Sequence, residues 1–89
     1  MCRSIRPLFN FDPPATPEEV RAASLQFVRK ISGIQKPSRA NEAAFAAAVD
    51  EIAGISRRLL DELQTGSPKR TREEEASRAK ARAALRFPK

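Results

Sequence analysis

The segment from Val28 to Ser38 constrains the fold most strongly, because it ends one amphipathic stretch, reverses the chain and begins the next. Gly33 can adopt the left-handed conformation that commonly ends a helix, and Ile34 can supply the apolar contact that accompanies such a cap. Pro37 then favours a turn over a continued helix. A short connection of this kind makes two helices antiparallel neighbours. The segment therefore predicts a helical hairpin.

The first helix of the hairpin is predicted over residues 17–33. Thr16 can cap it, Pro17 fits the first helical position, and Glu19 completes a capping box at the positive end of the helix dipole. Apolar and small residues then recur at spacings of three and four, which places them on one face of a helix. That face consists of Val20, Ala23, Ser24, Phe27, Val28 and Ile31.

The second helix is predicted over residues 39–64, with either Ser38 or Asn41 as its cap. Gly66 and Pro68 indicate that the helix ends before them. Its apolar face also repeats at spacings of three and four, and we expect it to pack against the first helix. The face consists of Phe45, Ala48, Val49, Ile52, Ser56, Leu59, Leu60 and Leu63. Two helices form only a thin core, so another segment or a second copy of the chain must cover what remains.

The N-terminal arm, residues 1–15, cannot form a continuous helix because it contains Pro7, Pro13 and Pro14. Its large apolar side chains are Ile5, Leu8, Phe9 and Phe11. Because such side chains avoid water, we expect the arm to lie extended across the hairpin and close one side of the core. The alternative is a docking segment for a partner protein.

A third helix is predicted in the C-terminal tail, residues 65–89. Thr71 and Glu74 have the spacing of a second capping box, and good helix formers follow from Arg72 to about Arg86. The alanines of this stretch offer only a weak apolar stripe, so the helix would gain little from burial.

The positive charge of the chain is concentrated in this tail. The net charge is +6, and residues 1–63 contain nine Lys or Arg against eight Asp or Glu, whereas residues 64–89 contain eight against three. A basic helix can contact phosphates and bind nucleic acid non-specifically, with an affinity that falls as salt rises. The alternative is a solvated face, which the lack of interleaved aromatic residues favours. The candidate polyanion-binding residues are Arg70, Arg72, Arg78, Lys80, Arg82 and Arg86.

Two further sets of residues are candidates for a functional role. Arg29, Lys30 and Lys36 lie around the hairpin turn without being needed to form it, so they are a candidate surface site. Cys2 is a candidate reactive thiol, because the nearby arginines favour its thiolate; it could be a redox-sensitive group, a nucleophile or a single metal contact. The alternative is an inert Cys2 under the hairpin, which the lack of a histidine base favours.

The composition argues against most enzyme classes. The chain has no His, one Cys and three separated Gly, which argues against imidazole acid–base catalysis, an internal disulfide, a Cys/His metal site and a glycine-rich phosphate loop. We therefore expect no enzymatic activity and no cofactor. No run approaches the roughly 18 apolar residues of a membrane span, and the N-terminus has no signal-type stretch. We expect a cytoplasmic protein that does not contact the membrane.

Several motifs of the chain resemble a family of short bacterial proteins, domain of unknown function 2277. They are Met1-Cys2-Arg3-Ser4-Ile5-Arg6, Pro13-Pro14-Ala15-Thr16, Gln26-Phe27-Val28-Arg29-Lys30-Ile31-Ser32-Gly33 and Lys36-Pro37-Ser38. The resemblance covers nearly the whole chain. Members of that family tend to carry Asn in place of Ser4 and Tyr in place of Phe27. The resemblance implies bacterial origin and a stand-alone small protein, and it carries no functional residue over to this chain.

The sequence thus predicts an all-α domain: an antiparallel helical hairpin with an extended N-terminal arm and a third, basic C-terminal helix. The leading functional hypothesis is a non-enzymatic binding or adaptor protein, whose partner is an unknown protein or a second copy of the chain. The alternative is an accessory protein that binds nucleic acid through the tail. A third, weaker hypothesis is a thiol-dependent role for Cys2.

Overall fold

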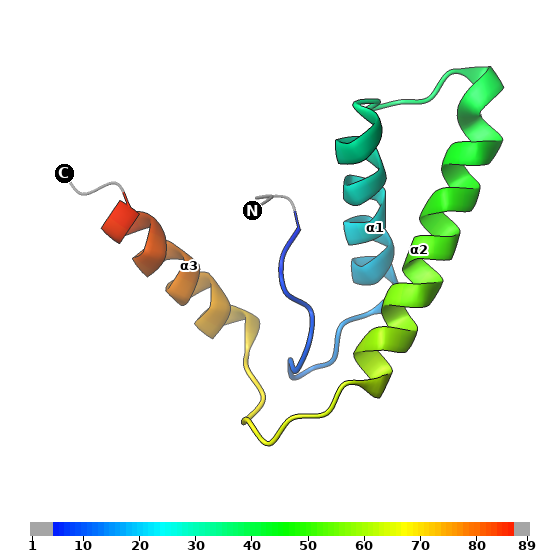
Figure 1. The fold of residues 1–89 in the computed structure, drawn as a ribbon. Coiled ribbons are helices and arrows are strands. Elements are labelled where there is room, and N and C mark those ends of the chain that lie inside the picture. Colours follow the sequence, from blue (N-terminus) through cyan, green and yellow to red (C-terminus); the bar gives the residue numbers. More distant parts are fainter. Residues whose placement is uncertain (1–4, 87–89) are drawn as a thin grey trace.

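The computed structural model describes residues 5–86 and confirms the all-α architecture (Figure 1). The elements are helix α1, Pro17–Ser32, the short 3-10 helix η1, Arg39–Asn41, helix α2, Glu42–Glu62, and helix α3, Arg72–Arg86. Residues 5–86 contain no strand, and their isolated β-bridge pairs Phe11 with Arg70.

Helix α1 begins and ends where its local sequence predicts. The Thr16 hydroxyl accepts a hydrogen bond from the Glu19 backbone N–H at 3.1 Å, and the Glu19 carboxylate accepts one from the Thr16 N–H at 2.9 Å. At the other end Gly33 has a φ of 70°, and its N–H donates to the Arg29 carbonyl at 2.9 Å. The predicted capping box and glycine cap are both confirmed.

Helix α3 also has the predicted limits. The Thr71 hydroxyl accepts a hydrogen bond from the Glu74 backbone N–H at 3.1 Å, so this capping pattern again starts a helix.

Helix α2 is shorter than its predicted range of 39–64. Residues 39–41 form η1 instead of the first α-helical turn, and neither Ser38 nor Asn41 makes a side-chain cap. The Asn41 amide group donates instead to the Ser38 hydroxyl at 3.2 Å, which ties the two side chains together ahead of the helix. At the other end Leu63 is extended, and its N–H closes the last turn on the Leu59 carbonyl. The helix therefore ends well before Gly66.

Helices α1 and α2 run antiparallel and pack along part of their predicted apolar faces (Figure 1). The buried side chains of the hairpin are Val20, Ser24, Val28, Val49 and Ala53. The Ser24 hydroxyl is satisfied because it donates to the Val20 carbonyl at 2.8 Å. Such small residues let the helices approach closely, but they form a thin core.

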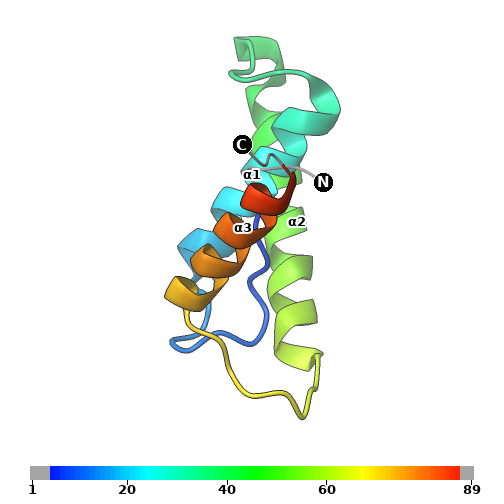
Figure 2. The ribbon, with the colours of Figure 1, turned by 90° about the vertical axis from the view of Figure 1, so that its left-hand side faces the viewer.

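The arm lies between the hairpin and α3, as two perpendicular views show (Figures 1 and 2). Beyond Arg72, its first residue, α3 does not pack against α1 or α2, and it diverges from them toward its C-terminal end (Figure 1). The molecule is consequently a flat V, with extents of 44 × 38 × 15 Å. Its Cα radius of gyration is 15.6 Å, whereas a compact chain of this length has a radius of about 12 Å.

Candidate binding surface

The arm and α3 are joined by a cluster around the buried ring of Phe11, which is only 4% exposed. The guanidinium carbons of Arg70 and Arg72 lie 5.0 and 5.3 Å from the centre of that ring. Distances of this size are typical of cation–π contacts. We call Phe11, Arg70, Arg72 and their partners Glu19 and Glu75 the clasp.

Arg72 connects the start of α3 to the start of α1. Its Nη2 and Nε donate to the two carboxylate oxygens of Glu19 at 2.9 and 3.2 Å, and its Nη1 donates to the Pro13 carbonyl at 2.7 Å. The Arg72 hydrogen bonds, and after them the N–H of Thr16, hold the pKa of Glu19 below its usual value of 4.5. Glu19 therefore belongs both to the α1 cap and to the clasp.

Arg70 connects α3 to the arm. Its Nη1 pairs with Glu75 at 3.0 Å and its Nη2 donates to the Phe9 carbonyl at 3.3 Å. Its backbone N–H donates to the Asn10 carbonyl at 2.9 Å, and its carbonyl accepts from the Asp12 N–H at 3.0 Å. These bonds satisfy both the backbone N–H and the backbone carbonyl of Arg70, and they hold the arm beside the start of α3.

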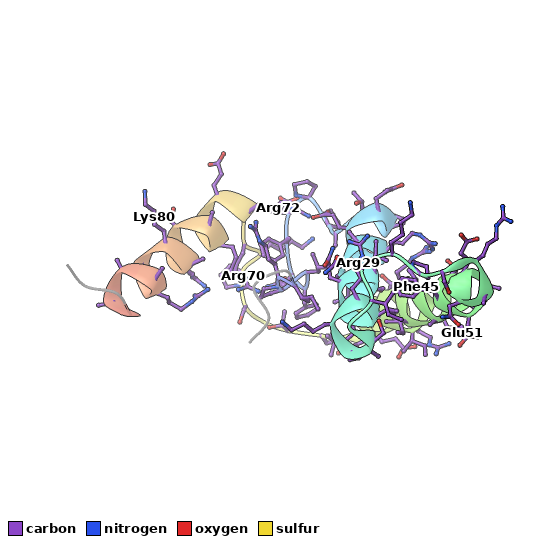
Figure 3. All side chains as sticks on the ribbon, turned by 90° about the horizontal axis from the view of Figure 1, so that it is seen from above. Arg29, Phe45, Glu51, Arg70, Arg72 and Lys80 are labelled. Atoms are coloured by element: carbon purple, nitrogen blue, oxygen red, sulfur yellow. The ribbon has the colours of Figure 1, made fainter. Side chains whose placement is uncertain are left out.

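The clasp separates the six candidate polyanion-binding residues into two groups. Arg70 and Arg72 are engaged in holding the arm, the hairpin and α3 together, and they lie between the hairpin and α3 in Figure 3. Arg78, Lys80 and Arg82 lie further along α3 and are exposed, with Arg82 in a long 3.5 Å ion pair with Glu75. Arg86 is the last residue of α3.

The other candidate residues do not gather into a site. The half-buried Arg29 donates from Nε to the Gln35 carbonyl at 3.0 Å, so it helps to hold the hairpin turn. The sequence pattern alone placed it beside the turn without a role in forming it. Lys30 and Lys36 are exposed. Cys2 lies outside the described residues.

An apolar groove runs along the side of the hairpin that faces the arm. It encloses about 390 Å³ and is lined by the arm, α1 and α2 together. We define the apolar groove by Ile5, Leu8, Ala23, Phe27, Ile52, Ser56 and Leu59. Ile5 and Leu8 confirm that the arm crosses the hairpin as predicted, but its described residues, 5–15, cover only part of this side. Phe27 remains 43% exposed and Leu59 54% exposed, although both were predicted on buried faces.

Exposed apolar side chains continue beyond the groove. Ile31, in the last turn of α1, is 67% exposed, and Leu63 at the end of α2 is 44% exposed. Ile55 is 59% exposed and lies three residues after Ile52 and four before Leu59, which puts it next to them on α2. Ile55 was missed in the sequence, although the same spacing rule could have found it.

A second hollow, of about 540 Å³, lies on the other side of Leu8. Leu8, Val20 and Leu60 line both hollows. The second hollow is more polar, because charged residues of both signs, Arg57, Asp61 and Lys69, also line it. Its mixed charge gives no clear preference for an anion or a cation, so the apolar groove is the stronger candidate.

The described residues contain neither a metal-type cluster nor a membrane-type helix. Nowhere between residues 5 and 86 do three or more His, Cys, Asp or Glu side chains gather as metal ligands would. No helix among those residues is long and apolar enough to cross a membrane.

Comparison with known proteins identifies the family of the chain. The model of an uncharacterised conserved protein family, DUF2277, matches residues 1–78, which include the arm, the hairpin, the clasp and the first half of α3. No curated protein and no solved structure matches the chain. Since the match covers most of its length, the chain belongs to the DUF2277 family of uncharacterised conserved proteins.

Proposed function

We propose that this protein is a non-catalytic adaptor that binds a helical segment of a partner protein in its apolar groove. The observation that carries the proposal is the exposure of large apolar side chains along the groove, above all Phe27 and Leu59. Single exposed apolar residues are normal, but a contiguous row on a small protein is typical of a binding site.

The shape and chemistry of the groove support a helix as the bound element. A helix that lays its apolar face into a groove between two other helices repeats the contacts of a helical bundle. The walls are helices α1 and α2, with the small residues Ala23 and Ser56 between larger ones, so another helix can approach closely. Burial of Phe27 and Leu59 would each contribute about 1 kcal/mol, since roughly half of each is still in water.

The proposal is for a binding protein because the chain offers little for catalysis. It contains no His, and its acidic side chains are engaged in caps, ion pairs or solvated faces. We further propose a bacterial, cytoplasmic setting, which the resemblance to short bacterial proteins supports.

Site-specific photo-crosslinking in the cells that produce the protein tests this proposal. A photoreactive phenylalanine analogue replaces Leu59 in the groove or, as the control, Ala84, an exposed residue on the outer side of α3 and outside the groove. We expect a defined protein adduct from position 59 that position 84 does not give. No adduct from position 59, or the same adducts from both positions, would contradict the proposal.

The second candidate function is non-specific binding of nucleic acid. It is favoured by the position of α3, which stands clear of α1 and α2 and keeps Arg78, Lys80 and Arg82 exposed. Against it, Arg70 and Arg72 already have partners within the chain. Titration of labelled DNA and RNA over about 50 to 200 mM salt tests it, because phosphate contacts weaken steeply across that range. Lack of affinity at the lowest salt would eliminate this candidate.

A further inference from the structure

The two sides of the V, the hairpin and α3, have different chemistry where they face each other. The hairpin contributes the apolar groove, with Arg6 from the N-terminal arm at its border. The side of α3 that faces the hairpin can be identified from Glu75, whose side chain is only 14% exposed and pairs with Arg70 in the clasp. Because Glu75 is anchored toward the arm, residues on the same side of α3 also face the hairpin.

Cations follow Glu75 along this inner side of α3. At about 100° per residue, Arg82 lies within about 20° of Glu75 around the helix and Arg78 within about 60°. The long ion pair between Arg82 and Glu75, at 3.5 Å, agrees with this placement. Lys80 is about 140° away, and Figure 3 shows it directed away from the hairpin. The inner side of the V is thus apolar on the hairpin and basic on α3.

We propose that the V binds an amphipathic helix of a partner protein whose apolar face enters the groove and whose polar face is acidic. This inference rests on the proposed function and adds the charge of the partner. The groove would desolvate the apolar face, while Arg6, Arg78 and Arg82 would attract the carboxylates. Charged groups within about 10 Å still interact at 0.1 M salt, so direct ion pairs are not required.

A second copy of the chain does not supply such a helix. Residues 16–64, which form the hairpin, contain seven Lys or Arg and seven Asp or Glu, so their net charge is zero. The remaining helix, α3, is basic. Helix α2 is acidic, with five Asp or Glu against two Arg, but its apolar face already packs against α1 and lines the groove of its own chain. It is therefore not free to enter the groove of a second copy, and a helix of a different protein is the occupant that we infer. Nucleic acid would match α3 but would leave the apolar groove without a partner.

Designed peptides test the inference directly. The probe is a labelled 18-residue helix with Leu at spacings of three and four and Glu elsewhere. One control replaces every Glu with Lys, and a second keeps the composition of the probe but scrambles the Leu positions. Binding to the full chain is measured by fluorescence anisotropy at about 0.1 M salt. We expect the acidic probe to bind at least about tenfold more tightly than either control, a difference of about 1.4 kcal/mol.

Matched variants locate the binding site. Leu59→Glu should weaken the acidic probe at least about tenfold. Ala84→Glu, which adds the same charge at an exposed residue about 180° from Glu75 on the outer side of α3, should weaken it far less. Arg82→Glu should weaken it more than Lys80→Glu, which changes the charge equally on the opposite side of α3. Circular dichroism shows whether each variant keeps its helices.

Each contrary outcome overturns a defined part of the inference. Equal binding of acidic and basic probes, with loss in Leu59→Glu, would overturn the acidic partner but leave the proposed groove intact. Equal effects of Arg82→Glu and Lys80→Glu would also overturn the acidic partner, because the inner side of α3 would then have no special role in binding. Tight binding of the scrambled probe would indicate a general polyanion surface instead. If no peptide binds, the inference fails, and crosslinking at position 59 judges the proposed function separately.

Discussion

Arg72 joins two segments of the chain to the start of α3. It contacts the cap of α1 through Glu19, and it contacts the arm through the Pro13 carbonyl and the ring of Phe11. In the sequence it lies within a basic stretch, which is why it was predicted as a phosphate ligand. Its partner Glu19 is 53 residues away. The charge pattern near Arg72 therefore could not reveal its structural role, because that role depends on how the chain returns to α1.

Arg72→Ala should lower the free energy of unfolding by about 1–2 kcal/mol, since it removes charged hydrogen bonds and a cation–π contact. Arg78→Ala, on the exposed part of α3, is the control and should change it by less than about 0.5 kcal/mol. Urea denaturation followed by circular dichroism measures both. The combined Glu19→Gln and Arg72→Ala variant should lose less than the sum of the single changes, because the two residues interact. Additive losses would show that the pair does not form.

The lowered pKa of Glu19 makes part of the stability depend on pH. Because the pKa is lower in the folded state, the ionised carboxylate stabilises the fold above the usual value of 4.5, and this contribution is lost as the pH falls through the folded pKa. Carboxyl NMR titration should show Glu19 titrating below that value, and Arg72→Ala should move it upward. An unchanged Glu19 pKa in the variant would show that Arg72 is not the cause.

At the scale of elements, the sequence predicts features that depend on neighbouring residues better than features that depend on distant segments. The ends of α1 and the start of α3 were predicted because their capping residues bond within three or four positions of each other. The start of α2 was not predicted correctly, because the Ser38 and Asn41 side chains bond to each other and neither caps the helix. The apolar stripes were predicted from spacing, but the exposure of Phe27 and Leu59 was not. Their exposure depends on the path of residues 5–15, which cross only part of the groove.

Two glycines should respond to alanine in opposite directions. Gly33 has a φ of 70°, which disfavours any side chain, so Gly33→Ala should destabilise the protein by about 1–2 kcal/mol. Gly54 lies in the exposed interior of α2, with open space around it, so Gly54→Ala should stabilise the protein by about 0.5–1 kcal/mol. Thermal and urea denaturation of both variants measure the changes. Equal effects of the same sign would contradict the assigned helix limits.

At the scale of the whole molecule, the sequence predicted three helices but not the V. The weak apolar stripe of α3 predicted little gain from burial, and this helix is held only at its start, by the clasp. Small-angle X-ray scattering should therefore give a radius of gyration near 15.6 Å, slightly increased by hydration. A value near the 12 Å of a compact chain of this length, about 2.2 times the length to the power 0.38, would show that α3 folds against the hairpin.

The open V is central to the proposed function, because it leaves both the groove and the inner side of α3 accessible. The most direct test is an NMR titration of the ¹⁵N-labelled chain with the acidic 18-residue probe. The account predicts that amide signals of Phe27, Ile52 and Leu59 shift together with those of Arg78 and Arg82, while Glu51 on the outer side of α2 stays in place. Shifts confined to the outer side of α2, or no shifts at saturating peptide, would contradict it.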